Sequence, residues 1–545
     1  MPTMTIDGTR IEFDGQKLIL QVALDNGIEI PHYCYHPGLS IVASCRICLA
    51  EVAQPNPRND NKVELIPKLM PTCQTPAADG MVVHTHSPKA IANQKAVMEY
   101  LLINHPIDCP VCDQAGECDL QDYSYKYGRA ASRFMEEKVK QPKKDIGPSV
   151  LLYSDRCIMC SRCVRFTREV TGTGEIGVFG RGHTEQIDIF PGNPLENELA
   201  GNVVDICPVG ALLDKDFLFE QRVWFLSQTP SIDGITASGD NIWIHHNEGQ
   251  VYRVKPRENP SVNKWWISDE IRYGWKFVHH EDRLRSPMRQ QYGVQTECDW
   301  TRAYAQVRDG FQTVVNEGGA GSLAVMVSPM LTCEEAYLLG KFVRALDDEA
   351  VLGIGPVPIE GEDKTFPGGY RLLAEKCPNL RGVRRALSML GRDVLEFDAF
   401  IEQLADKESN IAGVLLTGNY PNPWAPAELT KAVARKFVVL IDTLPNDLSL
   451  KADVMLPGAT WVEKAGTFAN ADDRLQSFEQ AIAVIELAKR EGQIAIDLAA
   501  ACNVGDKGIY EPQAVRNEMG GAFAHDVHHP PDTHRRKSDM QYVEL

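Results

Sequence analysis

The chain has 545 residues, a formal net charge of −18 and an ordinary globular composition, with 43% hydrophobic and 24% charged residues. This length predicts two to four domains. The negative charge argues against nucleic acid or anionic lipid as the main partner. The sequence has no apolar run of about 18 residues, so we expect no transmembrane helix. Residues 1–13 lack the features of a signal peptide and are too acidic for a transit peptide, so a soluble intracellular protein is expected.

Residues 1–80 have the pattern of a small β-grasp ferredoxin. Residues 5–13 predict a hairpin that turns at Asp7-Gly8, and residues 17–25 have helical spacing that ends at Asn26-Gly27. Four cysteines follow, in an order similar to that of plant-type ferredoxins but with a longer first gap: Cys34, Cys45, Cys48 and Cys73. A zinc knuckle is the alternative. The polar, proline-rich residues 54–68 predict a surface insertion.

A second group of candidate ligands lies within fourteen residues. Residues 88–103 have helical periodicity, and His105 follows this predicted helix at once. Three cysteines come next: Cys109, Cys112 and Cys118. Thiols and imidazoles spaced this closely are metal ligands more often than structural side chains, and an iron–sulfur cluster or a structural zinc could use them. The alternative for His105 is a capping or hydrogen-bonding role, with the fourth ligand from elsewhere.

A third group combines three cysteines at two-residue gaps with a distant Cys-Pro. It consists of Cys157, Cys160, Cys163 and, after 43 intervening residues, Cys207. This is the pattern of a bacterial [4Fe–4S] ferredoxin, and zinc rarely uses cysteines so tightly spaced. Four arginines surround the run: Arg156, Arg162, Arg165 and Arg168. Near a negatively charged cluster they would raise its reduction potential; the alternative is a solvated helix face. The three groups together supply twelve ligands, enough for three four-ligand sites.

Beyond about residue 215 the pattern changes to short apolar strands that alternate with helices. Residues 322–327, 413–417 and 437–441 predict strands and residues 334–346 a helix, which is typical of parallel α/β layers. The remaining cysteines share no motif and are expected to be buried apolar side chains: Cys298, Cys333, Cys377 and Cys502. From about Arg516 the chain is rich in histidine, proline and charge, so a disordered or extended tail is expected.

These motifs resemble the large iron–sulfur subunits, of the G type, of respiratory complex I (NADH:quinone oxidoreductase). The resemblance is specific over the first 220 residues, and residues 452–470 resemble the molybdopterin-oxidoreductase fold more loosely. It implies an α/β and α+β multidomain chain. Residues 1–80 would form the [2Fe–2S] ferredoxin, residues 81–145 the His/Cys [4Fe–4S] segment and residues 146–220 a ferredoxin-like [4Fe–4S] domain. Residues 221–515 would form a truncated molybdopterin-oxidoreductase-like domain without cofactor, and residues 516–545 a polar tail.

The resemblance also implies which residues hold each cluster. A [2Fe–2S] cluster would be bound by Cys34, Cys45, Cys48 and Cys73. One [4Fe–4S] cluster would be bound by His105, Cys109, Cys112 and Cys118, and a second by Cys157, Cys160, Cys163 and Cys207. No molybdopterin, FMN or NAD is expected in this chain, and no catalytic residue of its own.

In such a complex a flavin subunit oxidises NADH and passes on single electrons. They would cross the binuclear site, the all-cysteine site and the histidine-containing site, and leave through a two-cluster ferredoxin-like subunit toward quinone. The resemblance therefore implies a peripheral-arm subunit that meets the membrane only through the assembled complex and binds no nucleic acid. Its place would be the cytoplasmic face of a bacterial inner membrane, or the matrix face in a mitochondrion.

One departure from related enzymes bears on the alternatives. Some bacterial members carry a fourth cluster where this chain has Asp233, Thr236 and Asp240, with Ser268 near the fourth position, and these oxygen side chains are poor substitutes for thiolates. The alternative is the iron–sulfur subunit of a formate dehydrogenase or an NAD-linked hydrogenase. A molybdenum enzyme would need that cluster and a Cys-His pair, and a hydrogenase further paired cysteines, none of which the sequence has.

We also find no glycine-rich dinucleotide fingerprint. Gly172-Thr173-Gly174 lies inside the third ligand group, and residues 318–321 precede a predicted strand rather than follow one. The chain alone is therefore not expected to accept hydride from NADH.

Overall fold

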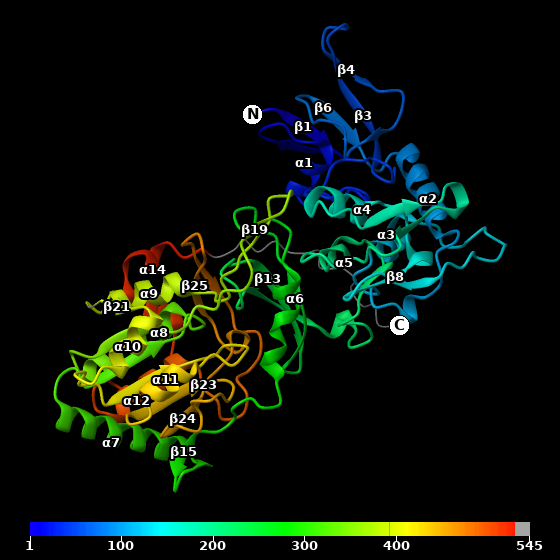
Figure 1. The fold of residues 1–545 in the computed structure, drawn as a ribbon. Coiled ribbons are helices and arrows are strands. Elements are labelled where there is room, and N and C mark those ends of the chain that lie inside the picture. The colour runs from blue at the N-terminus through cyan, green and yellow to red at the C-terminus, as the bar shows by residue number, and fades with distance from the viewer. Residues whose placement is uncertain (392, 529–545) are drawn as a thin grey trace, which may run out of the picture. The chain divides into compact units, whose positions relative to one another are not determined.

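In a computed structural model of the chain, residues 1–391 and 393–528 are described. They divide into two compact units (Figure 1). The first contains residues 1–226 and 366–370, and the second contains residues 227–365 and 371–528 of the described chain.

The first unit begins with a β-grasp sheet, as predicted. Its elements are β1 (Thr3–Ile6), β2 (Thr9–Glu12), α1 (Ile19–Asp25), β3 (Leu49–Asn56), β4 (Lys62–Leu65), β5 (Met70–Pro71) and β6 (Met81–His84). The strand order is β2-β1-β6-β3-β4, and β5 pairs with β3. Asp7 (φ 46°) and Gly8 (φ 87°) form the hairpin turn, since tight hairpins need positive φ at both turn positions. The buried faces of the sheet and of α1 form one core, so the predicted hairpin and helix are confirmed.

The predicted surface insertion has more order than the sequence suggested. Residues 62–65 are exposed, as expected, but they form β4, which pairs antiparallel with the end of β3 from Ala53↔Leu65 to Asn56↔Lys62. The insertion is thus a strand arm at the surface. Polar and proline-rich composition masked the strand, because an edge strand with both faces in solvent needs no apolar alternation.

The rest of the first unit consists of short elements. They are α2 (Pro88–Leu102), α3 (Asp119–Tyr127), β7 (Lys143–Asp145), β8 (Val150–Tyr153), α4 (Arg162–Arg165), a π turn (Phe166–Val170), β9 (Ile176–Phe179), β10 (Gln186–Ile189), α5 (Asn202–Ile206) and β11 (Leu212–Asp214). Four 3-10 turns lie between them: Cys109–Val111, Ser154–Arg156, Gly182–Thr184 and Val223–Phe225. The predicted helix over residues 88–103 is confirmed: the Ser87 hydroxyl accepts from the Ala90 N–H at its start, and Pro88 occupies the first turn.

The second unit opens with a three-stranded sheet and continues into a larger one. The first comprises β12 (Ser227–Ile232), β13 (Asn241–Asn247) and β14 (Gln250–Pro256), followed by α6 (Asp269–Tyr273) and a 3-10 turn (Gly274–His279). The strands of the larger sheet are β15 (Met288–Gln291), β16 (Val294–Glu297), β17 (Leu323–Val327), β18 (Val351–Ile354), β21 (Val394–Leu395), β22 (Gly413–Thr417), β23 (Phe437–Asp442) and β24 (Val454–Pro457). Two strand pairs lie outside it: β19 (Lys364–Thr365) with β20 (Arg371–Leu372), and β25 (Gly466–Ala469) with β26 (Leu475–Phe478). The expected strands and their parallel pairing are confirmed.

This sheet is doubly wound. Its order is β16-β15-β24-β23-β22-β17-β18-β21, and the six strands from β24 to β21 are parallel. The helices are α7 (Trp300–Gly318), α8 (Cys333–Leu346), α9 (Leu380–Ser388), α10 (Phe397–Ala405), α11 (Ala427–Ala432) and α12 (Glu491–Ala501), with a 3-10 turn at Trp461–Glu463. Alternate residues of β17 face two cores, one shared with α7, α8, α9 and α12 and the other with α10 and α11. The chain reverses direction across the sheet between β17 and β22, and such folds bind ligands at the carboxyl ends of the strands at this point.

The expectation of a disordered or extended tail from Arg516 is wrong for residues 516–525. These residues continue α13 (Pro512–Met519) and form α14 (Gly521–His525). The cause is a tertiary contact, since buried Arg516 donates from Nη1 to Glu334 Oε1 at 2.6 Å and Phe523 packs in the main core. Residues 529–545, the remainder of the expected tail, lie outside the described residues.

The cysteines without a motif behave largely as predicted: Cys333, Cys377 and Cys502 are buried, and Cys298 is partly buried. No helix within residues 1–391 and 393–528 combines the length and apolar character needed to cross a membrane.

Candidate functional site: three groups of cysteine and histidine ligands

All three predicted ligand groups lie in the first unit, and one hydrophobic core contains members of each. That core includes Cys34 and Cys45 from the first group, Cys118 from the second, and Cys157, Cys160 and Cys207 from the third. Across the described part of the chain, no three His, Cys, Asp or Glu side chains are grouped as a single metal ion would require. A multinuclear cluster holds its ligands further apart, so the wider arrangement of each group is what bears on the prediction.

The first group brings its four cysteines together. The thiols of Cys45 and Cys73 donate hydrogen bonds to Cys34 and hold its pKa well below the usual range, with further support from the Ser44 and Cys45 backbone N–H groups. Cys73 also contacts Cys48. The loop reaches this shape through left-handed backbone at Ala43 (φ 49°) and Arg46 (φ 59°) on either side of Cys45. Tight backbone with N–H groups aimed at sulfur fits a [2Fe–2S] cluster.

The second group is built around a neutral imidazole. Burial, together with the charges of Arg156 and Lys138, lowers the pKa of His105 to about 4, and the neutral ring is the form that binds metal. Its Nδ1 atom is buried and has no hydrogen-bond partner among the described residues. An orphaned ring nitrogen favours ligation over the capping alternative, and it fits a cluster ligand.

The cysteines of the second group differ in exposure: Cys109 is exposed, Cys118 is half-buried and Cys112 is buried. A Cβ atom at Gly210 would lie 2.3 Å from the Cys112 sulfur, so only glycine lets the backbone approach this closely. Burial raises the pKa of the Cys118 thiol to about 12, and the backbone N–H groups of Gln121 and Leu120 oppose that rise.

The third group surrounds a small cavity of about 20 Å³. Its walls are the four cysteines, six apolar side chains and two polar residues: Cys157, Cys160, Cys163, Cys207, Leu152, Ile158, Ile187, Val209, Ala211, Leu212, Ser161 and Arg162. Left-handed backbone at Met159 (φ 53°) and Ser161 (φ 59°) alternates with the cysteines, and the Met159 N–H donates to the Cys157 sulfur at 3.3 Å. Burial raises the pKa of all four thiols. Buried thiols around an apolar cavity fit a cluster that deprotonates them on binding.

The four arginines near the third group divide into two classes. Arg156, Arg162 and Arg165 are buried, whereas Arg168 is exposed. The predicted role beside a cluster thus suits the first three, and the solvated-face alternative suits Arg168. Arg156 pairs with Asp108 at 3.0 Å, and its guanidinium carbon lies 3.9 Å from the Tyr153 ring centroid.

In the second unit, the positions of a possible fourth cluster are taken up by hydrogen bonds. Asp233 Oδ1 accepts from the Ile235 N–H at 2.8 Å, and Oδ2 accepts from the hydroxyls of Thr236 and Ser238. Ser268 instead caps α6, accepting from the Ile271 N–H. These oxygen side chains satisfy one another and the backbone.

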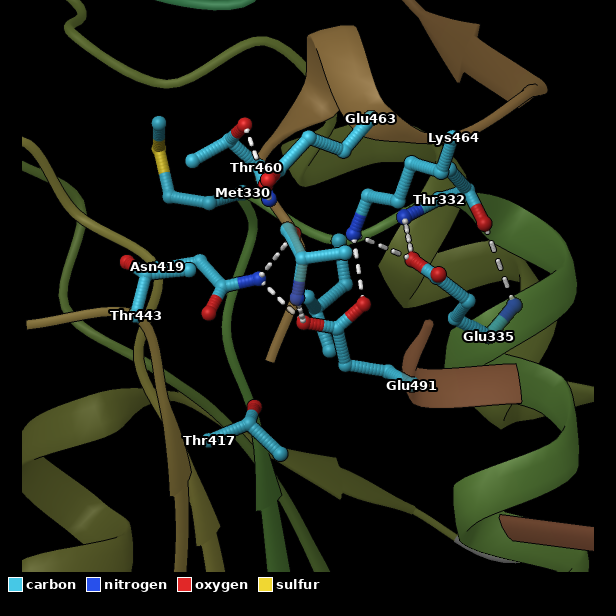
Figure 2. A network of polar contacts seen from close by, with 12 residues as sticks. Met330, Thr332, Glu335, Thr417, Asn419, Thr443, Thr460, Glu463, Lys464 and Glu491 are labelled. Atoms are coloured by element: carbon cyan, nitrogen blue, oxygen red, sulfur yellow. Dashed lines mark hydrogen bonds and ion pairs between the residues drawn. The ribbon is translucent and has the colours of Figure 1, made fainter. Parts of the chain in front are cut away.

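A second polar network lies at the carboxyl edge of the large sheet in the same unit (Figure 2). Lys464 Nζ is 2.8 Å from carboxylate oxygens of both Glu335 and Glu491, and all three side chains are fully buried. Asn419, which follows β22, donates from Nδ2 to Glu491 at 2.5 Å and to the Ala459 carbonyl at 3.1 Å. The network therefore fills the place where a doubly wound sheet usually binds its ligand.

Sequence reasoning missed several of these residues. Gly210 lies three residues after Cys207, and nothing in the local sequence indicates its close approach to Cys112. Tyr33 is fully buried next to Cys34, and its hydroxyl donates to the Met98 sulfur at 3.2 Å, a contact between residues 65 positions apart. Lys464 lies within residues 452–470, where only the resemblance was visible, and nothing local indicated its two buried partners.

Comparison with known proteins finds iron–sulfur and molybdopterin-oxidoreductase families along the chain. Family models match the chain in five places, described as a "2Fe-2S iron-sulfur cluster binding domain" (residues 1–88), the "NADH-ubiquinone oxidoreductase-G iron-sulfur binding region" (94–133), the "NADH-quinone oxidoreductase subunit 3, ferredoxin-like domain" (147–213), an "NADH-ubiquinone oxidoreductase NDSU1/NuoG-like, 4Fe-4S domain" (226–276) and "Molybdopterin oxidoreductase" (385–501). The match over residues 226–276 covers the segment in which Asp233, Thr236 and Asp240 occur.

The curated proteins that are similar to this chain are also subunits of NADH oxidoreductases. The G-type chain of NADH-quinone oxidoreductase from Rickettsia felis is 36% identical over 346 residues, which is 64% of this chain and 49% of the relative. The 78 kDa mitochondrial subunit of NADH-ubiquinone oxidoreductase from Neurospora crassa is 38% identical, covering 63% and 46%. The 75 kDa subunit from Reclinomonas americana is 39% identical, covering 66% and 50%. The chain spans about half the length of these relatives.

Among solved structures, a chain of an NAD⁺-reducing [NiFe]-hydrogenase in the H₂-reduced state is 27% identical, covering 41% of this chain and 91% of that one, with a TM-score of 0.34. The family matches and the curated relatives confirm the resemblance that the motifs carry: over about two thirds of its length, this chain is similar to large iron–sulfur subunits of NADH:quinone oxidoreductase.

Proposed function

We propose that this chain relays single electrons within the peripheral arm of an NADH:quinone oxidoreductase, from a flavin subunit toward quinone. The observation that carries the proposal is the shared core of the first unit, in which cysteines of all three ligand groups pack together. Sites that share one core are neighbours in the fold, and this favours successive one-electron steps between them.

The proposed ligands follow the three groups. Cys34, Cys45, Cys48 and Cys73 would hold a [2Fe–2S] cluster; His105, Cys109, Cys112 and Cys118 one [4Fe–4S] cluster; and Cys157, Cys160, Cys163 and Cys207 another. When bound, such clusters supply reversible one-electron exchange. The chain's own residues exclude water, direct backbone N–H groups at the sulfurs and set the local charge. His105 brings no negative charge, so its site carries one fewer than an all-thiolate site.

The partners follow from the chemistry. Hydride carries two electrons, and a one-electron relay needs a flavin to split them. A flavin subunit on one side and a two-cluster ferredoxin-like subunit on the other complete the path, with the chain on the cytoplasmic or matrix face of the membrane. No site for FMN or NAD is expected in the chain itself.

We further propose that the second unit holds no molybdopterin, although its family match names that class of enzyme. Two features support this. Lys464, Glu335 and Glu491 fill the carboxyl edge of the sheet with buried polar side chains that contact one another. A Cβ atom at Gly458 would lie 2.4 Å from Glu491 Oε1, so the backbone itself is packed against this network. Molybdenum bound at about one atom per chain would instead favour the formate dehydrogenase alternative.

The test measures reduction of ferricyanide by NADH with the purified chain alone and with a flavin subunit added. We expect no turnover above background by the chain alone, and reduction of its clusters when the flavin subunit is present. Substantial turnover by flavin-free chain would overturn the relay assignment. A flavin subunit that leaves the clusters oxidised would contradict the proposed path.

A further inference from the structure

We propose that Arg165 is a positioning residue shared by two ligand groups, joining the loop of Cys34 to that of Cys160 and placing one permanent positive charge between them. The inference rests on the proposed function, because it concerns how this side chain acts on the two clusters those groups would hold.

The guanidinium group of Arg165 bonds to both loops at once. Its Nη2 donates to the Cys34 carbonyl at 2.5 Å and lies 3.4 Å from the Cys160 carbonyl, and Nη1 donates to the Ser40 carbonyl. Its Nε donates to the Ser161 hydroxyl at 3.3 Å. Cys34 and Cys160 are 126 positions apart in sequence. One side chain therefore fixes the main-chain carbonyls of a ligand from each group.

The charge of Arg165 is buried, since the residue is only 8% exposed. Water screens a buried charge much less than an exposed one, so its field reaches the sulfurs of Cys34 and Cys160 on either side. The nearby carboxylate of Glu169 accepts from the N–H and hydroxyl of Ser40, at 2.8 and 2.5 Å. This carboxylate places a negative charge near Arg165, which partly offsets the positive charge of the guanidinium group.

The expected consequence is that Arg165 affects the reduction potentials of both clusters. Reduction adds a negative charge to a cluster, so a fixed cation beside it raises the reduction potential. Because Arg165 contacts both ligand loops, its removal should lower both potentials together. Lysine would keep the charge, but a single ammonium lacks the planar fork that reaches carbonyls on two loops. Charge and positioning can therefore be separated by substitution.

The experiment is an EPR-monitored redox titration of the full chain, purified anaerobically with its clusters. We expect R165Q to lower the midpoint potentials of both the [2Fe–2S] and the all-cysteine [4Fe–4S] signals. R165K should keep both potentials near the wild-type values and alter the magnetic interaction between the two reduced clusters, because their spacing is no longer fixed. The control is R168Q, which removes an exposed charge three residues further along the chain and should match the wild type.

Three results would overturn the proposal: R165Q with both clusters present and unchanged potentials, R165Q with a shift at one site only, and R165K with the wild-type interaction. If R165Q does not retain its clusters, E169Q decides instead. It removes the opposing charge and should raise both potentials, and no rise would overturn the charge role. A chain that binds no iron–sulfur clusters at all would refute the proposed function rather than this inference.

Discussion

Lys464 allows a quantitative test of the buried network in the second unit. Burial raises the pKa of Glu491, so of the two carboxyls beside Lys464 it is the one that binds a proton more readily. Burial also acts on Glu335, but the Lys464 ammonium group outweighs it and keeps the Glu335 pKa lowered. The charged pair at neutral pH is therefore Lys464 with Glu335, at 2.8 Å and without solvent exposure. Lys464→Met would leave the Glu335 carboxylate buried and unpaired.

The cost of this change has an upper limit set by proton uptake. Breaking a buried ion pair by removing one partner costs about 3–5 kcal/mol. Glu335 can avoid that cost by binding a proton. Protonating a carboxyl whose pKa in the unfolded chain is 4.5 costs about 3.4 kcal/mol at pH 7. We therefore expect K464M to lower the free energy of unfolding of this unit by about 3 kcal/mol at pH 7. In folded K464M the pKa of Glu335 is raised, so this carboxyl stays protonated while the unfolded chain loses the proton at neutral pH. The loss in free energy of unfolding relative to the wild type should therefore shrink by about 1.4 kcal/mol for each pH unit below 7.

The assay is native-state hydrogen exchange of the α8 and α12 amides in urea, at pH 5 and pH 7, because it reports this unit separately from the first. K451M, which removes an exposed lysine, should change stability by less than about 0.5 kcal/mol. The triple variant K464M/E335Q/E491Q should recover most of the loss, since replacing a whole buried charge set is often neutral. A K464M deficit below about 1 kcal/mol at pH 7, or one independent of pH, would refute the reasoning.

Three further predictions concern single residues. His105→Cys should lower the potential of the second cluster, because a thiolate adds negative charge; an unchanged EPR spectrum would mean that His105 is not a ligand. Gly210→Ala should displace Cys112 and reduce the iron content by about four atoms per chain, whereas Gly508→Ala, where a Cβ atom meets nothing closer than 3.9 Å, should not. For Asp233, burial raises the pKa to about 6, so its stabilising contribution is complete below about pH 4 and is lost as the pH rises through 6. The thermal stability of the wild type should therefore exceed that of D233N by more at pH 4 than at pH 7, and a constant difference would contradict this.

The candidate ligand groups could be proposed from the sequence because the pattern that suggests them is local. Cys157, Cys160 and Cys163 have the two-residue spacing typical of a loop around an iron–sulfur cluster, and this spacing is visible without any tertiary information. The strands β17, β22 and β23 were predictable for a similar reason, since strands buried on both faces are continuous apolar runs.

What could not be predicted depends on contacts between distant residues. Arg516 appeared to open a polar tail, yet its partner Glu334 lies 182 positions away and holds α13 in place. Gly210 is essential to the space around Cys112, about 100 residues earlier in the chain. Four arginines near one motif looked alike in sequence, and only their burial separates Arg165 from Arg168.

The central claim, that three iron–sulfur clusters are bound in the first unit and no pterin in the second, is tested most directly by metal analysis. Iron, sulfide, zinc and molybdenum would be measured in the full chain purified without oxygen. One binuclear and two tetranuclear clusters predict about ten iron atoms and about ten sulfides per chain, with no molybdenum. About fourteen iron atoms would reveal a fourth cluster, molybdenum near one atom per chain would contradict the empty second unit, and zinc in place of iron would contradict the account as a whole.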